Sequence, residues 1–253
     1  MIVYSRPPYP DINYPYIIVN VFDETSFNYI KPKSVKSVII DSGVHTIFHR
    51  YGLNEYPGGY KAWIAKVVRW YSFAKTLVDD VYAVVPDYPS DYENNPINDN
   101  VERTIRNIEY AISTYPNVKW IIPIQGKKDD VISVVRTLDH VVDMGVLKSH
   151  NYIAIGPTCS TRNVPFLKEI AALVLMRVKR IEKNGQRIRI HMFGTSMKSW
   201  KYIAPYIDST DTIVTNYWCL PLINKMCTKR EEKEMAWQIF LQRATEMLNI
   251  ERK

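Results

Sequence analysis

The feature that most constrains this chain is a regular alternation of short apolar runs with longer amphipathic patterns. Seven short runs rich in β-branched and aromatic residues are mostly apolar on both faces, which is typical of buried parallel strands. They cover residues 16–22, 37–40, 82–85, 119–124, 152–155, 187–192 and 212–214. Between them, apolar residues recur at helical spacing. This predicts helices at about 60–74, 101–112, 129–144, 165–183 and 196–206, with Gly145 and Gly185 ending the third and the fourth.

Repeated strand–helix units with right-handed crossovers form either an open doubly wound sheet or a closed barrel. The chain has no glycine-rich phosphate loop of the GxGxxG or GxxxxGK kind. The sequence therefore lacks the motif that would best support an open, nucleotide-binding sheet. We therefore predict an α/β fold, a (β/α)8 TIM-type barrel that tolerates irregular elements. The eighth strand is then residues 1–5 or a run that the pattern does not reveal.

The carboxyl-terminal tail predicts one more helix. Thr228 and Glu231 fit a capping box, and apolar residues then fall on one face up to Leu248. We expect this helix, at about 228–250, to pack on the barrel. Residues 1–253 then form a single domain.

Composition limits the setting of the protein. No stretch approaches 18 uninterrupted apolar residues, and the first residues do not resemble a signal peptide, so we expect a cytoplasmic protein without a membrane partner. Three cysteines without a CxxC pair predict inert thiols rather than a disulfide framework or a zinc site. The net charge of +7 fits a polyanionic partner such as nucleic acid, although many proteins without one are equally basic.

Polar residues and glycines appear where the apolar runs end. Five runs lead into Asp41, Asp87, Gln125, Gly156 and Gly194, and the segment DSTDTIV carries Asp208 and Asp211. A single Asp after a strand is usually a helix cap or a turn residue. In a barrel, however, all carboxyl ends of the strands meet at one mouth, where such barrels carry out chemistry. The sequence therefore predicts a pocket of several acids and one amide.

The same segments carry a family resemblance. In order, they are DSG (41–43), PD (86–87), QG (125–126), IG (155–156), FG (193–194) and DSTDT (208–212). They resemble the sites of tRNA-guanine transglycosylases, and more closely those of the related enzymes that insert 7-deazaguanines into DNA. The resemblance covers residues 37–218. It implies a TIM barrel that exchanges guanine in a nucleic acid for a 7-deazaguanine without breaking the phosphodiester chain, and that needs no metal or other cofactor.

Such an exchange requires a carboxylate that attacks C1′ of the sugar and an acid that carries the proton of ring nitrogen N9. The resemblance implies Asp211 as the nucleophile, with Asp208 as the rival assignment, and Asp41 as the general acid and base. It implies that Asp87 and Gln125, followed by Gly126, bind the guanine edge and that Gly156 allows close approach of the base. Ser42 and Gly43 shape the turn after Asp41, and Gly194 closes the FG motif.

The chain also departs from the family pattern. Val44 and His45 stand where the family has a glycine and a stacking aromatic, so His45 becomes the expected stacking residue. Pro157 replaces a second glycine of the tRNA enzymes. Neither a zinc cluster nor an RNA-binding domain follows the nucleophile region, which favours DNA over tRNA as the substrate. His45 and His49 are four residues apart but have no clear third metal ligand, so a surface position is the more common interpretation.

Other residues allow both a functional and a structural interpretation. Basic side chains that follow strand ends either contact phosphates or lie in solvated loops: Lys127, Lys128, Arg162, Lys198 and Lys201. Tyr88, Tyr92 and Tyr217 either stack on an extruded base or are structural. Two other functions stay open. One is a barrel that binds a purine or a nucleic acid without turnover, and the other is a retaining glycoside hydrolase that uses paired carboxylates on sugars.

Overall fold

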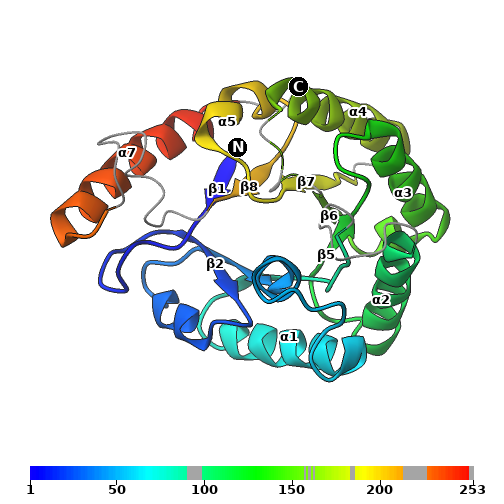
Figure 1. Ribbon diagram of the computed structural model, residues 1–253, viewed down its shortest axis with the longest axis horizontal. Helices are drawn as coiled ribbons and strands as arrows, with labels where there is room; N and C mark the ends of the chain where they lie inside the picture. Colours follow the sequence, from blue (N-terminus) through cyan, green and yellow to red (C-terminus); the bar gives the residue numbers. More distant parts are fainter. Residues whose placement is uncertain are drawn as a thin grey trace.

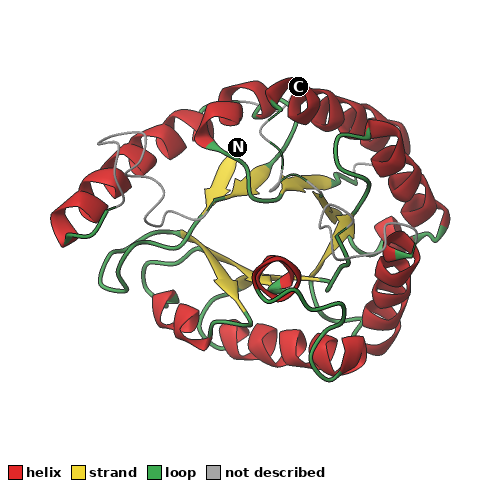
Figure 2. Cartoon of the chain, in the orientation of Figure 1, coloured by secondary structure: helices red, strands yellow, loops and turns green. Residues whose placement is uncertain are grey.

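The protein folds into a nearly closed barrel of eight parallel strands surrounded by helices (Figures 1 and 2). The structure, a computed structural model, describes residues 1–89, 99–156, 158, 161, 163–182, 186–212 and 227–250. The strand order is β1-β8-β7-β6-β5-β4-β3-β2. At the seam between β1 and β2, Ser5 pairs with Ile17, and its N–H donates to the Tyr16 carbonyl at 3.0 Å. The predicted (β/α)8 TIM-type barrel is confirmed.

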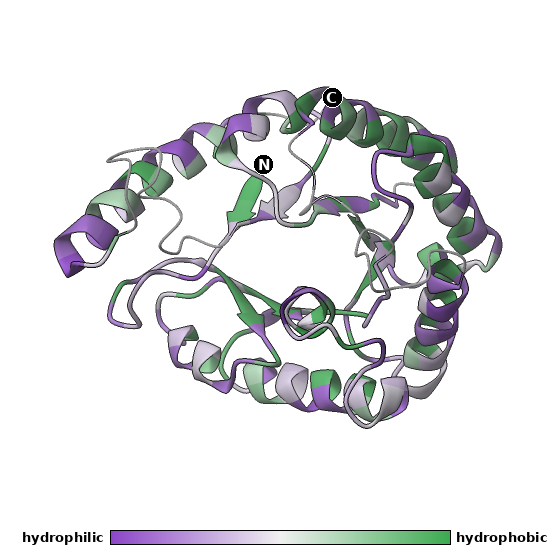
Figure 3. Ribbon diagram, in the orientation of Figure 1, coloured by the Kyte–Doolittle hydropathy of each residue, from purple (hydrophilic) through white to green (hydrophobic). Residues whose placement is uncertain are grey.

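The strands lie close to where the apolar runs predict them. They are β1 (Ile2–Tyr4), β2 (Tyr16–Asn20), β3 (Ser37–Asp41), β4 (Asp80–Val84), β5 (Trp120–Ile124), β6 (Tyr152–Ile155), β7 (Arg189–Met192) and β8 (Ser209–Asp211). The run at residues 1–5 does supply the remaining strand, and β1 and β2 are among the hydrophobic strands in Figure 3.

β8 begins earlier than predicted. It comprises Ser209–Asp211, Thr212 lies beyond it, and residues 213–214 lie outside the described residues. The apolar-run pattern missed β8 because its three residues are polar. They can lie in a buried strand because their side chains form hydrogen bonds inside the fold. Ser209 bonds to His191 across the strand pair, and Thr210 donates to the Met192 carbonyl at 2.7 Å.

Helices follow the strands on the outside of the barrel. They are α1 (Gly59–Lys75), α2 (Asn100–Thr114), α3 (Val131–Asp143), α4 (Val164–Ile181), α5 (Met197–Ile203) and α7 (Arg230–Leu248), with the short helices η1 (Glu24–Tyr29), η2 (His45–Arg50) and η3 (Val146–Lys148). No helix separates β1 from β2, whose connection, residues 5–15, is fully described. α7 contacts β1 and α5, so the tail helix packs on the barrel at that side, as predicted (Figure 1). Its N-cap is Lys229 with Glu232, one residue later than the predicted box.

The apolar side chains form two clusters. The larger one lies between the strands and the outer helices. The smaller one fills the inside of the barrel and consists of Tyr4, Ile39, Val84, Ile121, Tyr152 and Ala154, with Phe193 packed against it. This interior cluster supports the polar groups at the strand ends.

The structure bears on two further expectations, the absence of a membrane span and the state of the cysteines. No helix among the described residues is long and apolar enough to span a bilayer. The expectation of inert thiols is wrong for Cys227, which is buried and disulfide-bonded. The other two cysteines lie outside the described residues.

Candidate active site

Three acids from different strands gather at the carboxyl end of the barrel. Asp41 ends β3, Asp87 follows β4, and Asp211 ends β8. Loss of hydration, together with the negative charges of Asp211 and then Asp87, raises the pKa of Asp41 to about 7. Because these charges act on Asp41, the three acids share one site. The structure therefore brings together the acids that the strand-end pattern predicts.

Asp41 is held by the turn that follows it and by the neighbouring strand. Backbone N–H groups of Gly43 and Ser42 bond to its carboxylate and partly offset the rise of its pKa. Asn20, its register partner on β2, donates to Oδ2 at 3.2 Å. A side chain at position 43 would meet Asn20 Oδ1 at 2.7 Å, and φ there is +79°, so the turn requires glycine. The DSG motif therefore fixes the direction of the Asp41 carboxylate.

Asp87 and Gln125 form a buried pair. Their residues are 1% and 3% exposed, and the Gln125 amide donates to the Asp87 carboxylate. The Tyr56 hydroxyl donates to the Asp87 carbonyl at 2.5 Å, which anchors the loop after β4. Gln125 Oε1 is buried without a hydrogen-bond partner among the described residues. A buried acceptor without a donor is costly, so this oxygen is suited to an N–H group of a ligand.

The glycines that follow the strands make room for neighbouring groups. A side chain on Gly156 would meet the Gln125 amide at 2.6–2.9 Å, so this glycine accommodates Gln125 rather than a base directly. A side chain on Gly126 would meet Val134 at 2.4 Å, so that glycine lets α3 approach β5. The N–H of Gly194 donates to Asp211 Oδ1 at 3.0 Å.

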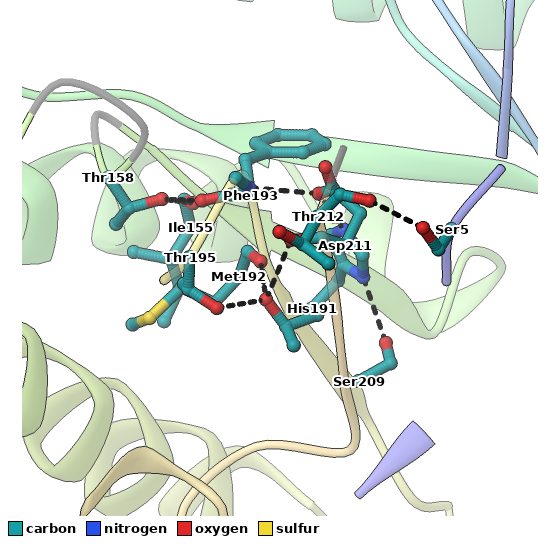
Figure 4. Close-up of polar contacts among 12 residues, drawn as sticks. Ser5, Ile155, Thr158, His191, Met192, Phe193, Thr195, Ser209, Asp211 and Thr212 are labelled. Atoms are coloured by element: carbon teal, nitrogen blue, oxygen red, sulfur yellow. Dashed lines mark hydrogen bonds and ion pairs between the residues drawn. The ribbon is translucent and has the colours of Figure 1, made fainter. Parts of the chain in front are cut away.

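Asp211 is anchored from β7 (Figure 4). His191 Nε2 lies 3.0 Å from Asp211 Oδ1, and the Asp211 side chain is 12% exposed. Both hydrogen bonds to this carboxylate in the described part of the chain end on Oδ1. Oδ2 is therefore the oxygen left for a substrate.

Asp208 lies at the other end of the same strand. Its carboxylate accepts from the Ile190 N–H at 2.8 Å and from Arg187 at 2.5 Å, before the start of β8. It lines a cavity of about 770 Å³ with Met1, Arg187 and Leu248, at the amino end of the barrel. The structure does not bring Asp208 to Asp41 and Asp87, so the geometry favours Asp211 over the rival nucleophile.

The other residues with an expected role differ in their burial. His45 is exposed on η2, where its ring stacks on that of His49 with the ring centres 4.7 Å apart. Tyr88 is fully buried, and its ring packs against Arg103, so its role is structural. Ser42 is buried in the turn, and its carbonyl accepts from Trp63 at 2.8 Å. The basic residues that are described are exposed, namely Lys127, Lys128, Lys198 and Lys201.

Four other residues with an expected role, Tyr92, Pro157, Arg162 and Tyr217, lie outside the described residues. In the part of the chain that is described, no cluster of three His, Cys, Asp or Glu side chains is arranged to hold a metal ion.

Three residues of the site were not recognised from the sequence. Asn20 lies within the predicted run at residues 16–22, whereas β2 ends at this residue, so the strand-end rule did not select it. His191 is completely buried, and Phe193 lies 5.2 Å from it, edge to face, on the interior cluster. From the sequence, His191 is expected only as a hydrogen-bonded strand residue, and Phe193 belongs to the FG motif, of which only Gly194 is a candidate site residue.

Compared with known proteins, the chain matches no family model, and no curated protein is significantly similar to it.

Proposed function

We propose that the protein is a nucleic-acid base-exchange enzyme that replaces guanine by a 7-deazaguanine such as 7-cyano-7-deazaguanine, with DNA favoured over tRNA. The observation that carries the proposal is the pairing of unlike acids at one mouth. Asp41 has a pKa near 7, whereas Asp211 accepts two hydrogen bonds that suit a carboxylate anion. Acids in unlike environments are the usual basis for separate acid and nucleophile roles.

In the first step, Asp211 Oδ2 attacks C1′ of the target nucleotide, and the bond from C1′ to N9 of guanine breaks. Asp41 gives its proton to N9, and guanine leaves as the neutral base. The product is a sugar joined to Asp211 as an ester, and the polymer stays intact. A general acid works best when its pKa is near the working pH, which is the case for Asp41.

In the second step, the incoming base gives its N9 proton to the Asp41 carboxylate. N9 then attacks C1′ and displaces Asp211, so the configuration at C1′ is retained after two inversions. Each proton that Asp41 donates is returned by the incoming base. The cycle is balanced without an oxidant, a reductant or a metal.

The pair of Asp87 and Gln125 supports purine recognition. Guanine presents N–H donors at N1 and at its exocyclic amine, and the pair offers a carboxylate and the unpartnered Gln125 Oε1. Phe193, on the interior cluster, provides an aromatic face close to the site. A base in duplex DNA has to be extruded to reach such a pocket.

The test is incorporation of radiolabelled guanine into duplex DNA, single-stranded DNA and bulk tRNA, measured in parallel. The variants are Asp211→Asn, Asp41→Asn and, as a matched control on the same strand segment, Asp208→Asn. Label is expected in one polymer, lost with Asp211→Asn, reduced at least about 100-fold with Asp41→Asn, and kept with Asp208→Asn.

Absence of label in every polymer, with folded protein that still binds nucleic acid, would refute base exchange and favour a binding module. Loss of label with Asp208→Asn but not with Asp211→Asn would reverse the assignment of the nucleophile.

A further inference from the structure

A chain of polar side chains crosses the inside of the barrel behind Asp211. His191 Nε2 is 3.0 Å from Asp211 Oδ1, and His191 Nδ1 is 2.9 Å from Ser209 Oγ. Ser209 Oγ is in turn 2.6 Å from the Tyr152 hydroxyl. All these contacts are buried, and the groups come from β6, β7 and β8.

The register of the strands produces this arrangement. His191 pairs with Ser209 across the parallel ladder, and Ser209 and Asp211 are two residues apart on β8. Residues two apart on a strand point to the same face. The His191 ring is thus within reach of both side chains, and each ring nitrogen has a partner.

The available protons determine which group donates in each of these hydrogen bonds. A carboxylate can only accept, so an ionised Asp211 requires a proton on His191 Nε2. In a neutral imidazole, Nδ1 is then the acceptor, Ser209 donates to it, and the Tyr152 hydroxyl donates to Ser209. Each of the two hydroxyl groups then donates one hydrogen bond, and every hydrogen bond in this chain of side chains is donated in the direction of Asp211.

Arg189 provides a cation near the far end of this chain. Its guanidinium lies 4.1 Å from the centre of the Tyr152 ring and donates to the Tyr82 hydroxyl at 2.7 Å. Burial raises the pKa of Tyr152 well above the ordinary value of 10.0, although the positive charge of Arg189 acts in the opposite direction, so Tyr152 stays neutral. The Tyr152 hydroxyl thus stays a donor at neutral pH.

We infer that His191 is the positioning residue of Asp211, oriented by Ser209 and Tyr152, and that it fixes Oδ1 so that Oδ2 faces C1′ of the substrate. The catalytic part of this inference rests on the proposed function, whereas the hold on Asp211 is a property of the fold. The same hydrogen bond stabilises the free carboxylate, so it also assists the departure of Asp211 from the covalent intermediate.

The two amide variants of His191 separate its contacts. The Gln amide nitrogen can take the place of Nε2 beside Asp211, whereas the shorter Asn amide reaches the place of Nδ1 beside Ser209. His191→Asn is expected to lower kcat for guanine exchange about 10- to 100-fold with little change in KM, the effect of losing a hydrogen bond to a charged group. His191→Gln is expected to recover most of that loss, and Ser209→Ala to give an intermediate one.

The control pair is His150→Asn and His150→Gln, at a buried histidine that has no place in this chain of side chains. Both are expected to exchange guanine like the parent. Equal rates for His191→Asn and His191→Gln would overturn the inference.

A second readout does not depend on activity. In protein with 15N-labelled histidine, the signals missing from His191→Gln identify His191, and at pH 7 they are expected to show a proton on Nε2. Asp211→Asn is expected to shift these signals, and Asp143→Asn, on the outer surface, to leave them in place. A bare Nε2, or signals that Asp211→Asn does not move, would overturn the hold on Asp211 even if exchange is observed. If no exchange occurs but the signals behave as expected, the proposed function fails while the hold on Asp211 stands.

Discussion

The environment of Asp41 lowers the stability of the folded protein, and in the proposed function the same environment suits a general acid. Its carboxyl group titrates at an ordinary value of 3.8 when unfolded and at about 7 in the folded protein. Between these values the folded protein binds one more proton than the unfolded chain, so the Asp41 contribution to the free energy of unfolding falls from about pH 4 to pH 7. Above pH 7 the loss is complete, and Asp41 is no longer an acid.

Asp41→Asn is therefore expected to raise the free energy of unfolding at pH 8 by about 1–3 kcal/mol, because the cost of a raised pKa disappears with the ionisable group. At pH 3.5 most of the gain is expected to vanish, since Asp41 is then largely protonated in both states. Urea unfolding at the two pH values measures this, with the exposed Asp143→Asn as the control. An equal gain at both pH values would show that ionisation is not its cause. Exchange by the parent protein is expected to decline above pH 7.

Gly156 provides a second test at the same scale. Its backbone is one that alanine adopts, but a Cβ would meet the Gln125 amide at 2.6–2.9 Å. Gly156→Ala is expected to displace Gln125 and to raise KM for guanine about tenfold, the effect of about one lost hydrogen bond. In a Gln125→Ala background the same change is expected to add little, because the displaced group is gone. Additive effects in this double-mutant cycle would show that Gly156 does not act through Gln125.

The sequence located most of the candidate site, because acids and glycines stand out at the ends of apolar strands. It did not separate Asp208 from Asp211, since both lie in one polar string and only the pairing of β8 with β1 and β7 places them at opposite ends. A histidine within a strand predicts a hydrogen-bonded side chain but not its partners, so the contacts of His191 with Ser209 and Asp211 could not be predicted. The role of Gly156 was also unpredictable, since Gln125 and Gly156 are brought together by the pairing of β5 with β6.

At the scale of elements, strands with continuous apolar runs were predictable and β8 was not. Burial makes most barrel strands apolar, but a strand that presents Ser209 and Asp211 to buried hydrogen-bond partners does not need to be apolar. The connection between β1 and β2 also departs from the alternation of strands and helices, because it contains no helix. α7 instead packs against β1, although it is the last described helix of the chain.

The packing of α7 is expected to be essential for the stability of the barrel. Trp237 is 1% exposed, stacks on Phe240 at 4.5 Å and meets Tyr14 edge to face at 5.2 Å. Trp237→Ala is expected to lower the free energy of unfolding by about 3–5 kcal/mol, the usual cost of such a cavity. Met235→Ala, on the exposed side of the same helix, is expected to stay within about 0.5 kcal/mol of the parent. Urea unfolding followed by circular dichroism measures both, and similar values for the two variants would mean that α7 is an appendage.

At the scale of the whole molecule, the two ends of the barrel differ in kind. Asp41, Asp87 and Asp211 lie at the carboxyl end. The negative charges of Asp211 and Asp87 lower stability and raise the pKa of Asp41. At the amino end, Arg187 and the Ile190 N–H are partners of Asp208, and the Met1 ammonium donates to the Met247 carbonyl at 2.9 Å. The barrel was predictable from the alternation of strands and helices, but the distribution of charge between its ends follows from register, which no local pattern encodes.

The pairing of β1 with β8 has a consequence for protein synthesis. Tyr4 lies beside Asp211 in the ladder, so β1 is synthesised some two hundred residues before the strand with which it pairs. Until β8 has been made, Asp211 cannot form its hydrogen bond with His191. The candidate site is therefore complete only after β8 has paired with β1 and β7, and Asp211 is the last of its three acids to be synthesised.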